Sequence, residues 1–368
     1  MLHRSIPAFA SSIILLALAL LSGCSRREET TGHHWFGMDT EFSAVLYGHG
    51  KTLLAPDSAF ALLEKESARL EQVFSDYLPG SELKKLAGRA GDTVRADAEI
   101  VTVFRAAEEM AGASRGRFDI TLHKLKRAYG LASGDSNQVP DDARLSEAMR
   151  GNPAFRAPQD SNPAAVPPFR ILAENRLVLL RDSAVFDLGG IAKGYAVDRM
   201  HAILDSLGYP NNIVTAGGDL RVSGKKRSDP WIVAIRHPRN HDGLAGRLIL
   251  WEPLAVSTSG DYERFFIRDG VRYHHIFDPF TGKPARPYCS VTVLAANSLL
   301  ADRLTKPLFI LGPEQGAYLL QRFGARAVWM REVEPLREGA AARLCFIPSP
   351  GLDEVLRMED ILPCGAAR

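Results

Sequence analysis

The residues best suited to do chemistry lie near the middle of the chain, between Asp187 and Tyr195. Two glycines, Gly189 and Gly190, precede an apolar pattern with helical spacing, which predicts a tight turn that opens a helix. Backbone N–H groups at a helix start favour an anion such as phosphate, and glycine allows a ligand to approach the backbone closely. Lys193 falls in the first turn, where a cation opposes the helix dipole but suits a bound phosphate. Taken alone, the stretch is better interpreted as a plain glycine turn beside a solvated lysine.

Four further polar motifs follow in the second half of the chain. One of them alone would be weak evidence of a function, and no spacing of cysteine and histidine matches a zinc site. The motifs are Gly217-Gly218-Asp219, Thr258-Ser259-Gly260-Asp261-Tyr262, His275-Ile276-Phe277-Asp278-Pro279-Phe280-Thr281-Gly282, and Ala301-Asp302 followed by Leu308-Phe309-Ile310-Leu311-Gly312.

Strands and helices must position these motifs, and apolar periodicity predicts where the elements lie. A stretch rich in Ser, Asn, Asp and Pro, residues 133–168, is expected to be a flexible surface excursion with a short helix over 145–149. Helices are predicted from a cap at Asp57 or Ser58, over 98–113, from the central motif to a stop at Gly208, and from a cap at Asn297 or Ser298. Strands are predicted over 35–47, 176–180, 184–186, 231–235, 246–251 and 290–294, with two more joined at the glycines of 213–222.

Composition sets broad limits on what the chain can be. Its 368 residues are enough for one large domain or two ordinary ones, and 46% of them are hydrophobic. A formal net charge of +2 gives no indication of bulk nucleic-acid binding. Beyond the N-terminal region there are three cysteines, Cys289, Cys345 and Cys364, which cannot all pair; Cys345 and Cys364 could form a bridge.

The N-terminus predicts a bacterial lipoprotein signal. Arg4 precedes an apolar run that is too short for a stable membrane span, and Leu21-Ser22-Gly23-Cys24 matches a lipobox. Cleavage before Cys24 and acylation of this residue would anchor the chain to a membrane of the cell envelope, facing the periplasm. An ordinary secretory signal with an incidental cysteine is the alternative, and the choice between inner and outer membrane stays open.

Together and in this order, the five motifs resemble those of the ApbE family, flavin transferases that act on FAD. The resemblance extends over about residues 35–330. It implies an α+β fold, ApbE-like and T-fold-like, with mixed sheets, packed helices and FAD in a central cleft. The expected layout is a signal peptide over 1–23, a lipidated tether over 24–34, an FAD-binding catalytic domain over 35–345 that includes the excursion, and a C-terminal tail over 346–368.

The resemblance also implies an activity. Members of the family cleave the FAD pyrophosphate and attach FMN through a phosphoester to a Thr or Ser of a target protein, with release of AMP. Magnesium is the implied cofactor, and the implied partners are extracytoplasmic domains of membrane redox proteins, such as sodium-pumping NADH:quinone reductase. Two other functions stay open: an FAD pyrophosphatase that yields FMN and AMP, and a non-catalytic FAD-binding lipoprotein.

Residue roles follow from the same resemblance. Displacement at phosphorus requires negative charge to be neutralised, and magnesium takes hard oxygen donors. The implied metal ligands are the Asp302 carboxylate and the carbonyls of Gly190 and Thr305, with Lys306 at the position of a usual threonine ligand. Contacts with FAD are implied for Met38, Tyr77, Arg117, Phe118, Asp119, Asp187, Lys193, His275 and Ile276. The implied catalytic group is His275, Asp302 and Lys193.

Two of these assignments have structural alternatives. His275 is the candidate base for the attacking hydroxyl, but it could instead support the turn at Asp278. Asp261 and Tyr262 could close the cleft around the flavin, or they could cap and pack a loop.

The chain departs from the family pattern at three positions. Asp39 stands where the family usually has glycine, and its side chain could point away from the flavin; Ala87 stands where it usually has asparagine. Lys306 replaces the usual threonine, and Pro307 after it predicts a kinked or tightened helix. The Lys306 ammonium either adds positive charge near the pyrophosphate beside magnesium, or stands in for the metal and weakens its binding.

Overall fold

The computed structural model describes residues 30–48, 52–86, 89, 91–132, 135–150, 169–173, 176–179, 185–226, 229–333 and 343–365. The predicted signal peptide and Cys24 lie outside these ranges, as do Ala87 and residues 151–168 of the predicted excursion. Within the described ranges, no helix is both long enough and apolar enough to cross a membrane.

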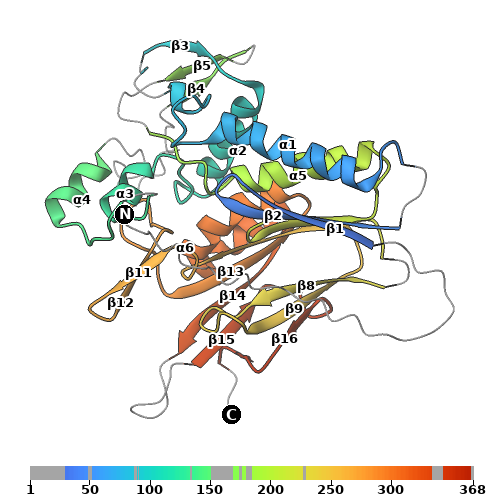
Figure 1. Ribbon diagram of the computed structural model, residues 1–368. Coiled ribbons are helices and arrows are strands. Elements are labelled where there is room, and N and C mark those ends of the chain that lie inside the picture. The colour runs from blue at the N-terminus through green and yellow to red at the C-terminus, as the bar shows by residue number, and fades with distance from the viewer. Residues whose placement is uncertain are drawn as a thin grey trace, which may run out of the picture.

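A nine-stranded sheet forms the frame of the molecule (Figure 1). Its strands are β1 (Thr30–Gly37), β2 (Thr40–Tyr47), β6 (Asn212–Ala216), β7 (Asp219–Ser223), β10 (Leu254–Gly260), β13 (Tyr288–Ala295), β14 (Arg326–Val333), β15 (Arg343–Pro348) and β17 (Leu362–Pro363). They are hydrogen-bonded in the order β1-β2-β6-β7-β10-β13-β14-β15-β17, and each pair is antiparallel except β15 with β17. In β2 every second side chain is buried, as expected for a strand that packs one face on a core.

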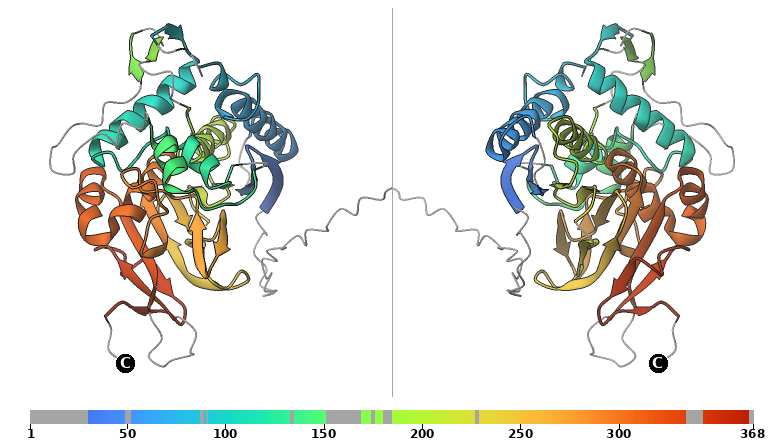
Figure 2. Two further views of the ribbon diagram at one scale, coloured as in Figure 1. Left: turned by 90° about the vertical axis from the view of Figure 1, so that its left-hand side faces the viewer. Right: turned by 90° about the vertical axis from the view of Figure 1, so that its right-hand side faces the viewer.

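Four long helices cover one face of this sheet (Figures 1 and 2). They are α1 (Pro56–Phe74), α2 (Ala98–Ala113), α5 (Ala192–Ser206) and α6 (Ser298–Phe323). Leu63, Leu204 and Leu308 come from three of these helices and are fully buried in one core with Phe42 of β2. Burial of each such side chain contributes about 1.5–3 kcal/mol, so this core fixes the helices that carry the central motif and Asp302.

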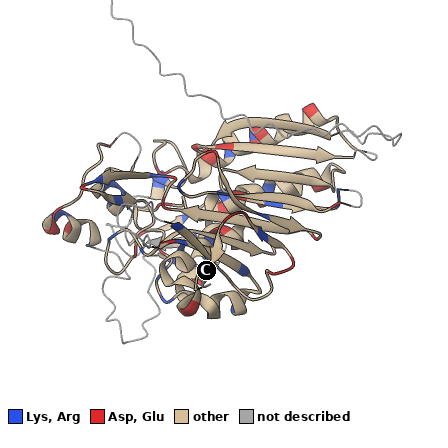
Figure 3. Ribbon diagram, turned by 90° about the horizontal axis from the view of Figure 1, so that it is seen from below, with Lys and Arg blue, Asp and Glu red and all other residues tan. Residues whose placement is uncertain are grey.

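A smaller sheet covers the opposite face. It consists of β8 (Trp231–Arg236), β9 (Leu244–Leu250) and β16 (Leu356–Met358), and Trp231 and Val233 pack there against Val256 and Met330 of the large sheet. The described chain is therefore layered as helices, large sheet and small sheet. Basic and acidic residues are interspersed over these elements, in keeping with the small net charge (Figure 3).

One end of the molecule carries short elements that lie next to the large sheet (Figure 1). Helices α3 (His123–Ala128) and α4 (Asp142–Met149) share a third core with the hairpin of β11 (Phe265–Arg268) and β12 (Val271–His274). A 3₁₀ helix, η1 (Lys84–Leu86), follows α1 in the chain, and a separate small sheet consists of β3 (Thr93–Arg95), β5 (Arg176–Leu179) and β4 (Phe169–Ile171).

The local predictions succeed where a helix is strongly periodic. Helix α2 has the predicted bounds, and α5 is followed by Gly208 with a φ of 87°. The predicted cap of α1 is wrong, because Pro56 occupies the first turn and Ala55 precedes it. The single strand predicted over 35–47 is a hairpin that turns at Met38 and Asp39, whose φ values are 49° and 59°. Residues 185–186 lie outside any strand.

Three boundary predictions require correction. Residues 30–34 of the expected tether belong instead to β1, which begins at Thr30 and pairs along its whole length with β2. The tail expected after residue 345 contributes β16 and β17, and the possible bridge between Cys345 and Cys364 is present; Cys289 is buried and free. In α6 the backbone stays helical at Lys306, and the interruption lies at Gly312, with φ 72° and ψ −176°.

Candidate functional site

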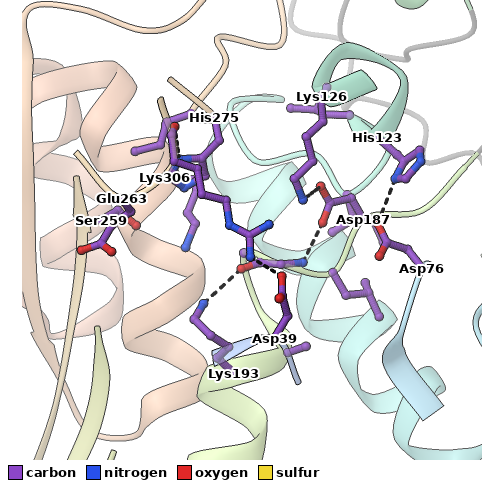
Figure 4. Close-up of a pocket in the computed structure, with 18 of the residues that line it drawn as sticks. Asp39, Asp76, His123, Lys126, Asp187, Lys193, Ser259, Glu263, His275 and Lys306 are labelled. Atoms are coloured by element: carbon purple, nitrogen blue, oxygen red, sulfur yellow. Dashed lines mark hydrogen bonds and ion pairs between the residues drawn. The ribbon is translucent and has the colours of Figure 1, made fainter. Parts of the chain in front are cut away.

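A cavity of about 600 Å³ opens between one end of the nine-stranded sheet, the turn at Gly189 and Gly190, and the short elements around α3 (Figure 4). This volume is within the ~300–1,000 Å³ usual for small-molecule sites. All nine residues predicted to contact FAD line it: Met38, Tyr77, Arg117, Phe118, Asp119, Asp187, Lys193, His275 and Ile276. Gly190 and Lys306 line it too, whereas Asp302 and Thr305 are fully buried behind its wall.

Asp302 is the centre of a buried ionic cluster. Its Oδ1 accepts a hydrogen bond from Lys306 Nζ at 2.7 Å, one helical turn away on α6, and its Oδ2 accepts one from the backbone N–H of Gly194 at 3.1 Å. Lys193 Nζ lies 3.9 Å from the same Oδ2 and 3.0 Å from Asp219 Oδ2. Two ammonium groups and two carboxylates thus alternate in one chain of contacts, in which Lys193, Lys306 and Asp219 line the cavity and Asp302 lies behind them.

The charges in this cluster control one another. Burial alone would raise the pKa of Asp302, but the ammonium groups of Lys193 and Lys306 outweigh it and lower that pKa. Burial and the Asp302 carboxylate raise the pKa of Asp219. Burial works to lower the pKa of Lys193, yet Asp219 and Asp302 raise it overall. Lys193 and Asp302 are therefore both ionised at neutral pH, and Asp219 is the carboxylate that accepts a proton most readily.

The glycine turn is held by Asp187. Its Oδ1 accepts the backbone N–H of Gly189 at 2.9 Å, and its Oδ2 accepts Lys126 Nζ at 2.8 Å. Burial alone would raise the pKa of Asp187, but Lys126 lowers it well below its usual range. Gly190 passes so close to Lys306 that a Cβ there would lie 3.1 Å from Cε. The glycine therefore lets α6 present its lysine directly beside the turn.

Gly194 serves a second close approach, between α5 and α6. A Cβ at this position would lie 2.8 Å from the Cβ of Asp302 and closer still to the carbonyl of Ser298. The close packing also brings the Gly194 N–H onto the Asp302 carboxylate. The last glycine of the central motif is thus required for helix packing, while the first two serve the turn.

His275 lies at the cavity wall beside several cations (Figure 4). Burial, Lys126 and Lys306 hold the pKa of His275 well below its ordinary value, so the ring is neutral at neutral pH. Its Nδ1 lies 3.4 Å from the carbonyl of Arg264. The turn at Asp278 is held by Arg117, at 2.6 Å, and by the backbone N–H of Phe280.

The segment Asp261-Tyr262 has the packing role and not the cleft-closing one. Asp261 accepts two hydrogen bonds from Arg239, at 2.7 and 2.8 Å. The Tyr262 ring packs against Gly260, which lines the cavity, whereas Asp261 and Tyr262 themselves are not part of the lining.

The rim contains groups that sequence reasoning missed. Asp39 does not point away from the cavity: it lines it and forms an ion pair with Arg264. Lys126 on α3 and the pair of His123 with Asp76, at 2.8 Å, complete the opposite wall (Figure 4). These partners are far apart in the chain, so no local spacing could have indicated them.

The groups implied as magnesium ligands are already engaged within the protein. Asp302 is the one side-chain ligand of that set, and both of its oxygens already accept hydrogen bonds. The Thr305 hydroxyl donates to the Asp302 carbonyl at 2.7 Å and accepts from Ser259 at 2.8 Å. Among the described residues, no three His, Cys, Asp or Glu side chains are grouped to hold a metal ion. The residues present do not fit a resident divalent cation.

Comparison with known proteins gives a consistent match. The ApbE family model matches residues 38–329. An FAD:protein FMN transferase of Rhodobacter capsulatus is 32% identical over 76% of this chain, although the chain spans only about half, 51%, of that relative. An FAD:protein FMN transferase of Treponema pallidum is 33% identical, with 73% of this chain and 74% of the relative covered. The crystal structure of the ApbE protein of Thermotoga maritima superposes with a TM-score of 0.71 at 30% identity, covering 86% of this chain and 96% of that one. The chain therefore belongs to the ApbE family.

Proposed function

We propose that this chain is an FAD:protein FMN transferase, which cleaves the FAD pyrophosphate, attaches FMN to a Thr or Ser hydroxyl of a target protein and releases AMP. The observation that carries the proposal is the pair of lysines, Lys193 and Lys306, at the cavity wall beside the glycine turn. A dianionic pyrophosphate fits this place, because preorganised cations stabilise the charge of the displaced phosphate in a site shielded from water.

His275 is the proposed base. The target hydroxyl attacks the phosphorus on the FMN side, and the new P–O bond forms as the P–O bond to AMP breaks, so that AMP leaves with the bonding electrons. A carbonyl can only accept a hydrogen bond, so the Nδ1 that faces the Arg264 carbonyl carries the proton and Nε2 is left to accept the hydroxyl proton. The lowered pKa of His275 keeps the ring in the neutral form that this role needs.

Magnesium has a limited place in this proposal. Because the Asp302 carboxylate is engaged by Lys306, we expect the FAD-free protein to bind magnesium weakly. Titration of magnesium into FAD-free protein, followed by calorimetry, tests this expectation. Tight binding at one site would contradict it.

We also propose that Cys24 is acylated and that the chain is a lipoprotein of the bacterial cell envelope facing the periplasm. The Cys345–Cys364 disulfide supports this proposal, because such bonds persist in oxidising compartments. The proposed acceptors of FMN are extracytoplasmic domains of membrane redox proteins. Labelling with a fatty-acid analogue, compared with a Cys24→Ala variant, tests the anchor.

Mass spectrometry of the acceptor tests the activity. Purified protein is incubated with FAD, magnesium and a candidate acceptor domain, and we expect the acceptor to gain the mass of FMN while AMP appears. An Asp302→Ala variant should lose this activity, and Lys65→Ala, an exposed change on α1 away from the cavity, should keep it. AMP with free FMN would indicate hydrolysis, and unchanged FAD would indicate a binding protein.

A further inference from the structure

Lys306 lies where the three groups implied for a metal site come together. It follows Asp302 by four residues on α6, and its Nζ donates to Asp302 Oδ1 at 2.7 Å. A Cβ on Gly190 would lie 3.7 Å from this Nζ, so the ammonium is also beside the glycine turn. Its side chain is 20% exposed, whereas the Asp302 carboxylate is 0% exposed, so the cation faces the cavity and the anion supports it from behind.

A divalent cation on Asp302 would compete with this arrangement. Magnesium binds oxygen at about 2.1 Å, so an ion on Oδ1 would lie no more than about 5 Å from the ammonium of Lys306. The other oxygen, Oδ2, accepts the Gly194 N–H and has Lys193 Nζ at 3.9 Å. Both oxygens therefore face positive charge or donors, and a third cation there would be repelled.

We propose that Lys306 is the catalytic cation of this chain: its ammonium takes the position beside Asp302 that a divalent ion would occupy and neutralises the FAD pyrophosphate itself. This inference rests on the proposed transferase function. Lys306 forms no covalent bond and transfers no proton, so the bonds made and broken are those of the transfer reaction alone. Asp302 then acts as a positioning residue that keeps the Lys306 ammonium aimed at the cavity.

The test compares divalent-metal dependence in the full-length protein and in two variants. Rates of AMP formation from FAD with an acceptor domain are measured in excess EDTA and in excess magnesium. We expect wild-type protein to keep most of its rate in EDTA, and Lys306→Thr to lose about 10²-fold in EDTA and to recover with magnesium. Lys65→Thr, the same change on the exposed face of α1, should behave like wild type in both conditions.

A second readout does not depend on activity. Mn²⁺ binding to FAD-free protein is followed by electron paramagnetic resonance, and we expect Lys306→Thr to bind at least about tenfold more tightly than wild type. Wild-type protein that is inactive in EDTA but active in magnesium would overturn the proposal and leave the transferase function standing. Equal Mn²⁺ affinity of folded Lys306→Thr and wild type would overturn it as well. Absence of AMP in all conditions would instead contradict the proposed function. If Lys306→Thr fails to fold, the comparison of wild-type rates in EDTA and in magnesium still tests the proposal.

Discussion

The close packing of α5 on α6 at Gly194 allows a substitution whose effect can be worked out in advance. In Gly194→Ala the new Cβ would lie 2.8 Å from Asp302 Cβ and closer to the Ser298 carbonyl, so the helices must separate. Overpacking of this kind costs about 1–3 kcal/mol, and a carbonyl of the neighbouring helix cannot rotate away as a side chain can. The gain in helix propensity from Gly to Ala, about 1 kcal/mol, offsets part of the cost. Because the clash is with backbone, we take the upper end of the overpacking cost, about 3 kcal/mol, and expect a net loss of about 2 kcal/mol in the free energy of unfolding.

Gly112 provides the matched control. It lies in α2, and a Cβ added there would have no neighbour within 4 Å. Gly112→Ala should therefore stabilise the protein by about 0.5–1 kcal/mol, the opposite sign from Gly194→Ala. Urea denaturation of the wild type, Gly194→Ala and Gly112→Ala measures both changes in the free energy of unfolding. The expected difference of about 3 kcal/mol between the two variants exceeds the usual ~10–15% error of an extrapolated free energy of unfolding.

Gly194→Ala should also reduce activity. The Gly194 N–H donates to the Asp302 carboxylate that holds Lys306, so separation of the helices shifts this ion pair at the cavity wall. A misplacement of about 1 Å typically costs ~10²-fold in rate, measured as AMP formation. A Gly194→Ala protein with wild-type stability and rate would refute the account of this contact.

Four further predictions concern charged groups of the cavity. Lys126→Met should lower the free energy of unfolding by about 1–3 kcal/mol and weaken FAD binding, because the lysine pairs with Asp187 at 2.8 Å. Since the folded-state pKa of Asp187 is lowered, its contribution to stability is present above about pH 4 and is lost as pH falls towards that pKa; Asp187→Asn should flatten this part of the pH profile. His275→Gln should slow transfer by about 10²-fold, and the wild-type rate should stay level down through about pH 6.5; a fall centred there would contradict a lowered pKa. Because the pKa of Asp219 is raised, FAD should bind more tightly as pH falls towards that pKa, and Asp219→Asn should remove that dependence in fluorescence titrations.

Local signals in the sequence predicted the parts of the site that lie within one element. The glycine turn, the helix after it and the cap of α6 at Asn297, whose side chain accepts the Leu300 N–H at 2.9 Å, all depend on neighbours in the chain. The proximity of Asp302 and Lys306 could also be predicted locally, because residues four apart share a helix face. What spacing could not give was the direction of the Lys306 ammonium, which depends on the nearby approach of Gly190.

Contacts between distant segments were beyond the reach of sequence reasoning. Lys126 reaches Asp187 from 61 residues away, and Arg264 reaches Asp39 from 225 residues away. The interruption of α6 is different, because the sequence contains a local signal for it. Two prolines lie within the helix; the predicted kink was at the first, Pro307, whereas the interruption lies beside the second, Pro313. Gly312 precedes Pro313 and, as a glycine, can adopt the positive φ that Lys306 before Pro307 would resist.

The pairing of charges around the cavity explains where a pyrophosphate is expected to bind. Two of the pairs are layered, with a cation nearer the surface than its carboxylate: Lys193 is 24% exposed over Asp219 at 3%, and Lys306 is 20% exposed over Asp302 at 0%. In two other pairs both partners are equally accessible, with Lys126 at 16% and Asp187 at 18%, and Arg264 at 43% and Asp39 at 44%.

An anion that approaches an evenly exposed pair meets both charges, whereas one that approaches a layered pair meets the ammonium first. The cavity is thus positive towards a ligand at Lys193 and Lys306, even though each lysine is matched by a carboxylate. Because these lysines are already held in place, binding of the pyrophosphate requires little reorganisation, which is the condition under which fixed charges stabilise a transition state most effectively.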